Sequence, residues 1–278
     1  MRPFKQVDVF TAVPYLGNPV AVVLDGSGLT AETMQRFTDW TNLSEATFVL
    51  PPTHADADYR LRIFCPGREL PFAGHPTLGS CHAWLEAGGV PKARQVVQEC
   101  EVGLVRIRRD GARLDFAAPP LQRGGPLADE DVELVARGLR VSRTDIVAHA
   151  WCNNGPEWRA VMLRSAEQVL SLRPDRALLD GLFVGVVAPH APGRGECDFE
   201  VRAFFPGRDG LVEDPVTGSL NAALGQWLTG AGLAPSRYVA AQGTALARAG
   251  RVHVERDETG NVWIGGESAT CIDGRVTL

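Results

Sequence analysis

The residue with the clearest catalytic chemistry is Glu45, which lies in the segment Leu43-Ser44-Glu45-Ala46-Thr47-Phe48. It follows a helix expected over residues 31–41 and directly precedes an apolar run that is typical of a strand. A carboxylate with apolar neighbours can have a raised pKa and act as a general acid or base. The alternative for a glutamate between a helix and a strand is an ordinary solvated loop residue.

Two further polar motifs begin the strongest predicted helices. Gly74 and His75 precede an apolar helix expected over residues 76–87, and Asp214 precedes one expected over residues 215–229. A proline at the first helical position and glycine after the end predict both boundaries. Because both helices are apolar almost all round, we expect strands to surround them.

A helix N-terminus carries unpaired N–H groups and a partial positive charge, so two such starts could hold an anion. Gly74 and Gly218 would let a ligand come close, while His75, Asp214 and Ser219 would orient it. The alternative interpretation treats Asp214 as an ordinary N-cap, Ser219 as a first-turn serine and His75 as a capping substitute.

The chain also repeats itself. Residues 62–68 match residues 202–208 at five of seven positions, 140 residues apart, and residues 75–80 resemble residues 214–219 at an offset of 139. One residue is therefore expected to be gained or lost between the blocks. A chance match is the alternative, but it does not explain a second block nearly in register.

The repeat predicts an α+β protein with two pseudo-symmetric domains, each a set of strands around one central helix. We place the domains at residues 1–120 and 121–278, with the final strand, about residues 268–278, as a candidate to return to the first domain. A short helical insert is expected at residues 129–137, and a hairpin is expected around Asp110-Gly111.

Composition excludes several classes of protein. A net charge of −5 argues against nucleic acid as a partner, and no apolar run is long enough for a membrane span, so a cytoplasmic location is expected. The six cysteines show no metal-finger or disulfide spacing, and no phosphate-binding loop, lipase-type serine motif or zinc-protease motif is present. His75 and His82 lack a third ligand in the sequence nearby, so no metal is expected and His82 is interpreted as a core histidine.

The ordered motifs resemble the PhzF-like proteins of phenazine biosynthesis, which share the diaminopimelate-epimerase fold. The similarity is carried by D-V-F-T-x-x-P-x-x-G-N-P at residues 8–19, S-E-A-T-F at 44–48, E-L-P-F-A-G-H-P-T-L-G at 69–79, E-D-P-V-T-G-S at 213–219, and Gln242-Gly243. It spans the whole chain.

The resemblance implies two barrel-like domains with the site in the cleft between them, and neither cofactor nor metal. It places a proton-shuttling glutamate at Glu45 and substrate contacts at His75, Asp214 and Ser219; with Gly74, Gly218 and Asn18 these form the predicted site. A homodimer is expected, partly from the resemblance and partly because each half has apolar strands to cover. The opposed cysteines of the epimerases would fall on Ala73 and Pro215, so a thiol pair is missing here.

These observations predict a PhzF-like isomerase that moves a proton within a small carboxylate substrate, such as a dihydro-hydroxyanthranilate. Two alternatives stay open. One is an amino-acid epimerase or racemase of the same fold, and the other is a non-catalytic binding protein that keeps the fold.

Overall fold

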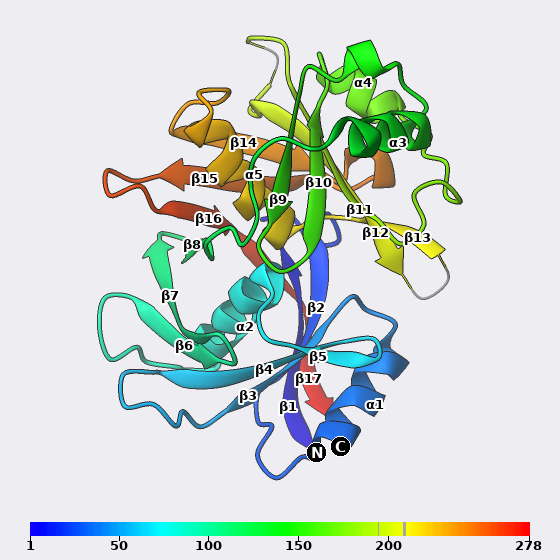
Figure 1. Cartoon of the computed structure of the whole chain (residues 1–278). Coiled ribbons are helices and arrows are strands. Elements are labelled where there is room, and N and C mark those ends of the chain that lie inside the picture. The colour runs from blue at the N-terminus through cyan, green and yellow to red at the C-terminus, as the bar shows by residue number, and fades with distance from the viewer. Residues whose placement is uncertain (194, 208–209) are drawn as a thin grey trace. The chain divides into compact units, whose positions relative to one another are not determined.

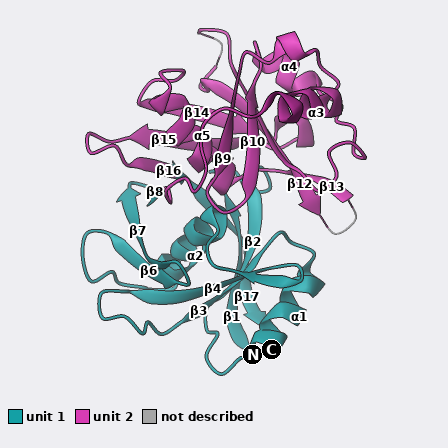
Figure 2. Ribbon diagram, viewed as in Figure 1, with its two compact units in different colours: residues 1–117, 265–278 teal, residues 118–264 magenta. Residues whose placement is uncertain are grey.

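The computed structural model describes residues 1–193, 195–207 and 210–278. The chain forms two compact units, one made of Met1–Ala117 with Gly265–Leu278 and the other of Ala118–Ile264 (Figure 2). Both the N-terminal strand and the C-terminal strand belong to the first unit (Figure 1). No helix in the described ranges combines the length and apolar character of a membrane span.

The first unit contains nine strands that lie wholly within it and two helices. In chain order these are β1 (Arg2–Val9), β2 (Asn18–Val23), α1 (Ala31–Thr41), β3 (Ala46–Leu50), β4 (Tyr59–Cys65), β5 (Arg68–Leu70), α2 (Gly74–Glu86), β6 (Val96–Cys100), β7 (Gly103–Asp110), β8 (Arg113–Ala117) and the returning β17 (Ser268–Val276). Strand β17 pairs antiparallel with β1 and thereby fixes the C-terminus to this unit.

The second unit repeats this order and adds helices near its start. It contains α3 (Asp129–Leu139), the 3-10 turn Arg143–Asp145, β9 (Ala148–Asn153), β10 (Glu157–Met162), α4 (Ala166–Ser171), β11 (Phe183–Pro189), β12 (Phe199–Gly207), β13 (Gly210–Asp214), α5 (Gly218–Gly230), β14 (Arg237–Gln242), the 3-10 turn Thr244–Leu246 and β15 (Gly250–Arg256). Strand β16 (Val262–Gly266) runs across the boundary between the units in the chain.

Strand pairing is duplicated between the two units. In the first, β1–β2 is antiparallel, β2–β3 parallel, β3–β4 and β4–β5 antiparallel, β4–β6 parallel and β6–β7 antiparallel. The second has the same sequence of pairings from β9–β10 to β14–β15. The internal repeat in the sequence is therefore a repeat of topology.

The offset between the repeats changes within one hairpin. Phe64 of β4 pairs with Glu69, and Phe204 of β12 pairs with Glu213. The spacing between equivalent residues therefore grows from 140 on the first strands of the hairpins to 144 on the second strands. The β12–β13 hairpin is longer because Pro206↔Leu211 and Gly207↔Gly210 are additional pairs. The expected offset of 139 after the hairpin is wrong; Arg208, the last residue of the matched block, lies outside the described residues.

Burial explains why α2 and α5 are apolar. Nine of the thirteen residues of α2 and eight of the thirteen of α5 are buried. Helix α2 packs against β1, β2, β3 and β8, and α5 packs against β9 and β15. At Gly79, an added Cβ would lie 2.5 Å from the Val20 side chain, so glycine allows α2 to approach β2 closely.

The other local predictions can be compared directly with the structure. Helix α1 has the predicted bounds, α3 continues two residues beyond the predicted end, and β7 and β8 form the expected hairpin. Helix α5 starts at Gly218 rather than at Pro215, and α2 starts at Gly74 rather than at Pro76. The prolines lie near the helix starts but do not begin them.

Candidate active site

The first unit brings Glu45 and His75 together. Glu45 precedes β3, His75 is the second residue of α2, and the Glu45 Oε2 and His75 Nε2 atoms lie 3.3 Å apart. The His75 side chain is 6% exposed and that of Glu45 is 16% exposed. The carboxyl group is therefore largely removed from water while part of it stays accessible.

The protonation state of His75 follows from its surroundings. Burial lowers the pKa of this imidazole from 6.5 to about 3, although a hydrogen bond with the backbone of Pro19 opposes the shift. Proline has no N–H, so its carbonyl accepts and the ring donates. Because Nε2 lies against Glu45, we assign the donor as Nδ1. The neutral ring then presents the Nε2 lone pair to the Glu45 carboxyl.

The start of α2 is held by buried polar side chains. Gly74 is the first helical residue after the N-cap Ala73, which makes no side-chain cap. Gln98 of β6 donates from Nε2 to the Thr77 hydroxyl at 3.0 Å and accepts from the Tyr59 hydroxyl at 3.1 Å. Asn18, the first residue of β2, is buried beside Pro19 in the chain.

The second unit gathers Asp214 and the start of α5. Asp214 is the last residue of β13, and its Oδ2 accepts from the Thr217 hydroxyl at 2.7 Å. Thr217 is the N-cap of α5 and Gly218 its first residue. Asp214 is thus not the N-cap, contrary to the alternative considered from sequence, because the strand runs on to this residue.

Gln242 at the end of β14 holds this helix start. Its Oε1 accepts from the Thr217 backbone N–H and from Asn221 Nδ2, while its Nε2 donates to the Asp214 carbonyl and the Thr217 hydroxyl, all within 2.8–3.1 Å. The sequence drew attention to Gln242 only through a motif match. Thr217 and Asn221 were missed as members of the network because threonine and asparagine near a helix start are common.

Ser219 is bound by the β9–β10 hairpin. The Trp158 indole Nε1–H donates to Ser219 Oγ at 3.2 Å, and Asn154 Nδ2 donates to the Ser219 carbonyl at 2.9 Å. Neither Asn154 nor Trp158 was predicted from sequence, because each lies more than sixty residues away from Ser219.

The corrected offset also changes which residues are equivalent. Ala73 and Thr217 are the N-caps of α2 and α5, 144 residues apart. The position equivalent to Ala73 in the second unit is therefore Thr217. Neither residue has a thiol.

His82 does not lie in the core. Its Nε2 is 3.2 Å from Glu86 Oε1 and 3.1 Å from the Thr270 hydroxyl, and its side chain is 19% exposed. The predicted hydrogen-bond satisfaction of this histidine is confirmed by Glu86 and Thr270, but the predicted core position is not, because the side chain is only partly buried. No group of three or more histidine, cysteine or acidic residues suited to a metal ion occurs among residues 1–193, 195–207 and 210–278.

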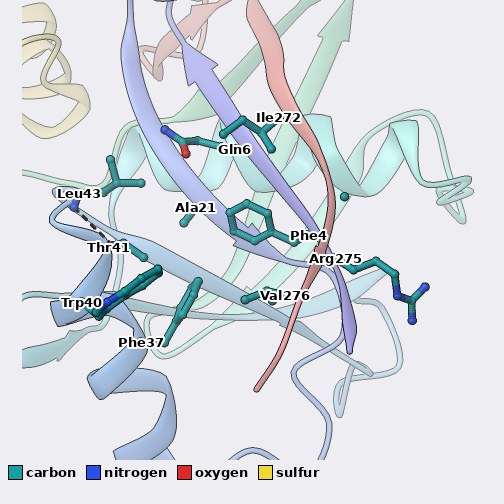
Figure 3. A pocket seen from close by; sticks show the side chains of 11 residues that line it. Phe4, Gln6, Ala21, Phe37, Trp40, Thr41, Leu43, Ile272, Arg275 and Val276 are labelled. Atoms are coloured by element: carbon teal, nitrogen blue, oxygen red, sulfur yellow. Dashed lines mark hydrogen bonds between the residues drawn. The ribbon is translucent and has the colours of Figure 1, made fainter.

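A separate groove lies in the first unit. It is formed between α1, β1 and β17, with Phe37 and Trp40 on the helix and Phe4 and Val276 on the strands (Figure 3). Arg275 is the only ionisable residue of its lining. Since neither Glu45 nor His75 contributes, the groove does not contain the candidate acid/base chemistry.

The fold and the polar helix starts define an α+β protein of the epimerase-like class. The sequence matches the family described as "Phenazine biosynthesis-like protein" over residues 7–274, and the chain belongs to this family. The resemblance noted from the motifs is thereby confirmed.

Individual relatives agree with this assignment. A Schizosaccharomyces pombe protein named "Antisense-enhancing sequence 1" is 37% identical, with 98% of this chain and 97% of that protein covered. The trans-2,3-dihydro-3-hydroxyanthranilate isomerase of Pseudomonas aeruginosa is 34% identical over 100% of both chains. Because this relative is named an isomerase, the comparison supports isomerase activity in this chain.

Solved structures confirm the fold. A PhzF-family phenazine biosynthesis protein from Bacillus anthracis has a TM-score of 0.84 at 22% identity, covering 100% of this chain and 99% of that one. A probable proline racemase from Agrobacterium radiobacter has a TM-score of 0.62 at 15% identity, covering 100% and 93%. The predicted epimerase-like α+β fold is therefore confirmed.

Proposed function

We propose that the protein is a PhzF-like isomerase that moves a proton within a small cyclic carboxylate of the trans-2,3-dihydro-3-hydroxyanthranilate type. Glu45 is the acid/base in this proposal. The observation that carries it is the close pair of Glu45 and a buried, neutral His75. The named isomerase among the relatives supports the substrate class.

The pair has the properties that a proton shuttle needs. A neutral imidazole whose Nδ1 donates to Pro19 accepts at Nε2, so it stabilises the proton-carrying form of the facing carboxyl. A single carboxyl group can then take a proton from one carbon and return it to another.

Substrate binding is assigned to the remaining predicted residues. The first turn of a helix offers N–H groups to a carboxylate, and Gly74 and Gly218 leave that backbone uncovered by side chains. Ser219 and Asp214 supply a hydroxyl and a carboxylate, which suit the carboxylate, amino and hydroxyl groups of such a substrate. Asn18 belongs to the binding set in this proposal, as does His75 through its ring.

Isotope exchange tests the reaction. In deuterium oxide, wild-type protein should convert trans-2,3-dihydro-3-hydroxyanthranilate to its isomer, with deuterium at the receiving carbon in the fraction of turnovers in which the Glu45 carboxyl exchanges its proton with solvent before returning it. Deuterium at an inverted stereocentre without movement of a double bond would instead identify an epimerase. Binding with neither conversion nor exchange would identify a non-catalytic protein. Glu45→Gln should bind the substrate and exchange no deuterium.

A further inference from the structure

Trp158 makes a contact whose geometry bears on how Ser219 can act. The residue is the second of β10, it is 2% exposed, and its ring packs edge-on against Phe183 at a centroid distance of 5.3 Å. Its position is thus fixed by packing. The indole Nε1–H points at Ser219 Oγ, 3.2 Å away.

The chemistry of the two groups determines the direction of this bond. An indole N–H can only donate, whereas a serine hydroxyl has one proton to donate and accepts through its oxygen. Ser219 Oγ must therefore accept from Trp158. Within the described part of the chain, no group accepts a hydrogen bond from the Ser219 hydroxyl. Its proton is consequently left for a ligand.

The serine itself is held from two sides. Asn154 Nδ2 donates to the Ser219 carbonyl, and both Asn154 and Trp158 belong to the β9–β10 hairpin. A hydroxyl that accepts a bond from a rigid donor cannot turn its own proton toward that donor. The hairpin thereby orients the hydroxyl before substrate arrives, which reduces the entropy lost on binding.

We propose that Trp158 is a positioning residue that makes Ser219 a hydrogen-bond donor to the substrate carboxylate. This inference rests on the proposed function, because it assigns Ser219 to the carboxylate of that substrate. A donor bound to the Trp158 N–H is also polarised, so its bond to an anion is strengthened. Trp158 itself touches no substrate in this assignment.

A double-mutant cycle tests the proposal. The dissociation constant for anthranilate, a stable carboxylate analogue, and the KM and kcat for trans-2,3-dihydro-3-hydroxyanthranilate would be measured for wild type, Trp158→Phe, Ser219→Ala and the double variant. Trp158→Phe keeps an aromatic ring but removes the N–H. It should weaken anthranilate binding and raise KM roughly fivefold to tenfold when Ser219 is present, and change neither in the Ser219→Ala background.

Trp263→Phe is the matched control. Trp263 is also a buried tryptophan of the second unit, and its indole N–H donates to Asp257 Oδ2 at 2.8 Å. Losing that bond should lower thermal stability without changing KM. Effects of Trp158→Phe and Ser219→Ala that simply add, or a Trp158→Phe variant that binds like wild type, would overturn the proposal.

The experiment distinguishes failure of the proposed function from failure of the role assigned to Trp158. Wild-type protein that neither binds anthranilate nor converts the substrate overturns both assignments, whereas turnover with an additive cycle overturns only the role of Trp158. Should Trp158→Phe not fold, the six indole N–H resonances of wild type and Ser219→Ala provide the second test. One resonance should move upfield in Ser219→Ala, and six unchanged resonances would overturn the proposal.

Discussion

The two units have the same strand pairing around α2 and α5, yet they place different chemistry at two equivalent positions. His75 and Ser219 are the second residues of α2 and α5. Glu45 corresponds to Phe183. The residues that follow them, Ala46 and Val184, pair with Phe64 and Phe204, which are equivalent in the two units.

In the first unit these positions hold a carboxyl and an imidazole, so the group can hold and release a proton. In the second they hold a phenyl ring and a hydroxyl, which do not titrate near neutral pH. At these two positions the equivalent elements differ in the chemistry of their side chains. The comparison favours chemistry by one acid/base and binding by neutral donors.

The largest effect should come from removing the carboxyl of the first unit. Glu45→Gln keeps the shape of the side chain but cannot carry the proton, and kcat should fall ~10²–10⁴-fold. Phe183→Leu, at the equivalent position of the second unit, should leave kcat within about a factor of three, because no proton transfer depends on it. Steady-state kinetics of the two variants would measure both effects, and similar losses would mean that the units are not divided in this way.

A second difference concerns two equivalent ion pairs. Arg62 binds Glu69 and Arg202 binds Glu213, each through Nε and Nη2, but the Arg202 side chain is 6% exposed and that of Arg62 is 21% exposed. Arg202 also donates to the Val169 and Leu172 carbonyls of the α4 region.

Replacing these arginines should therefore have unequal costs. Arg202→Met leaves the largely buried Glu213 carboxylate without its arginine partner and should lower the free energy of unfolding by ~3–5 kcal/mol. Arg62→Met should cost about 1 kcal/mol or less, because water can solvate Glu69. Urea denaturation would measure both, and equal losses would contradict the role assigned to burial.

The imidazole of the first unit should also make stability depend on pH. An unfolded histidine binds a proton near pH 6.5, whereas folded His75 resists protonation down to about pH 3. Between these values the unfolded state binds more protons, so the free energy of unfolding falls as pH falls, by ~1.4 kcal/mol per pH unit from this group.

His75→Ser copies the residue of the second unit and should remove that contribution. The free energy of unfolding, measured by urea denaturation from pH 6 to pH 4, should change less steeply with pH than in the protein that keeps His75. The difference in slope should correspond to the uptake of one proton on unfolding. Both proteins would carry Glu45→Gln, because the Glu45 carboxyl faces His75 and its titration would change with the substitution. Groups away from His75 titrate alike in both proteins and cancel in the difference. An unchanged slope would mean that His75 is protonated at its ordinary pH in the folded protein.

The smallest effects should come from the neutral donor of the second unit. Ser219→Ala removes one hydrogen bond to the substrate carboxylate and should raise KM by about tenfold, with a smaller change in kcat. Asp214→Asn should change KM and kcat together, since it also loses the charge that binds the Thr217 hydroxyl. Loss of kcat alone in Ser219→Ala would place this residue with the acid/base chemistry.

Much of the architecture could be predicted from residues close together in the sequence. The bounds of α1 follow from Thr30, whose side chain caps the helix, and the repeat around Arg62 and Arg202 identified the equivalent strands. The offset after the hairpin could not be predicted, because Pro66-Gly67 is a turn whereas Pro206 and Gly207 continue a strand. The same Pro-Gly sequence therefore adopts different backbone structures in the two units.

The sequence by itself determined the family, the α+β class and the residue types available for chemistry, because these depend on local pattern and on ordered motifs. Only the tertiary structure decided that His75 is neutral, that its Nε2 meets Glu45, and that Trp158 binds Ser219. The physical reason is that burial and hydrogen-bond direction arise from strands and helices distant in the chain. A side chain's protonation and donor role are set by those neighbours, which spacing in the sequence does not specify.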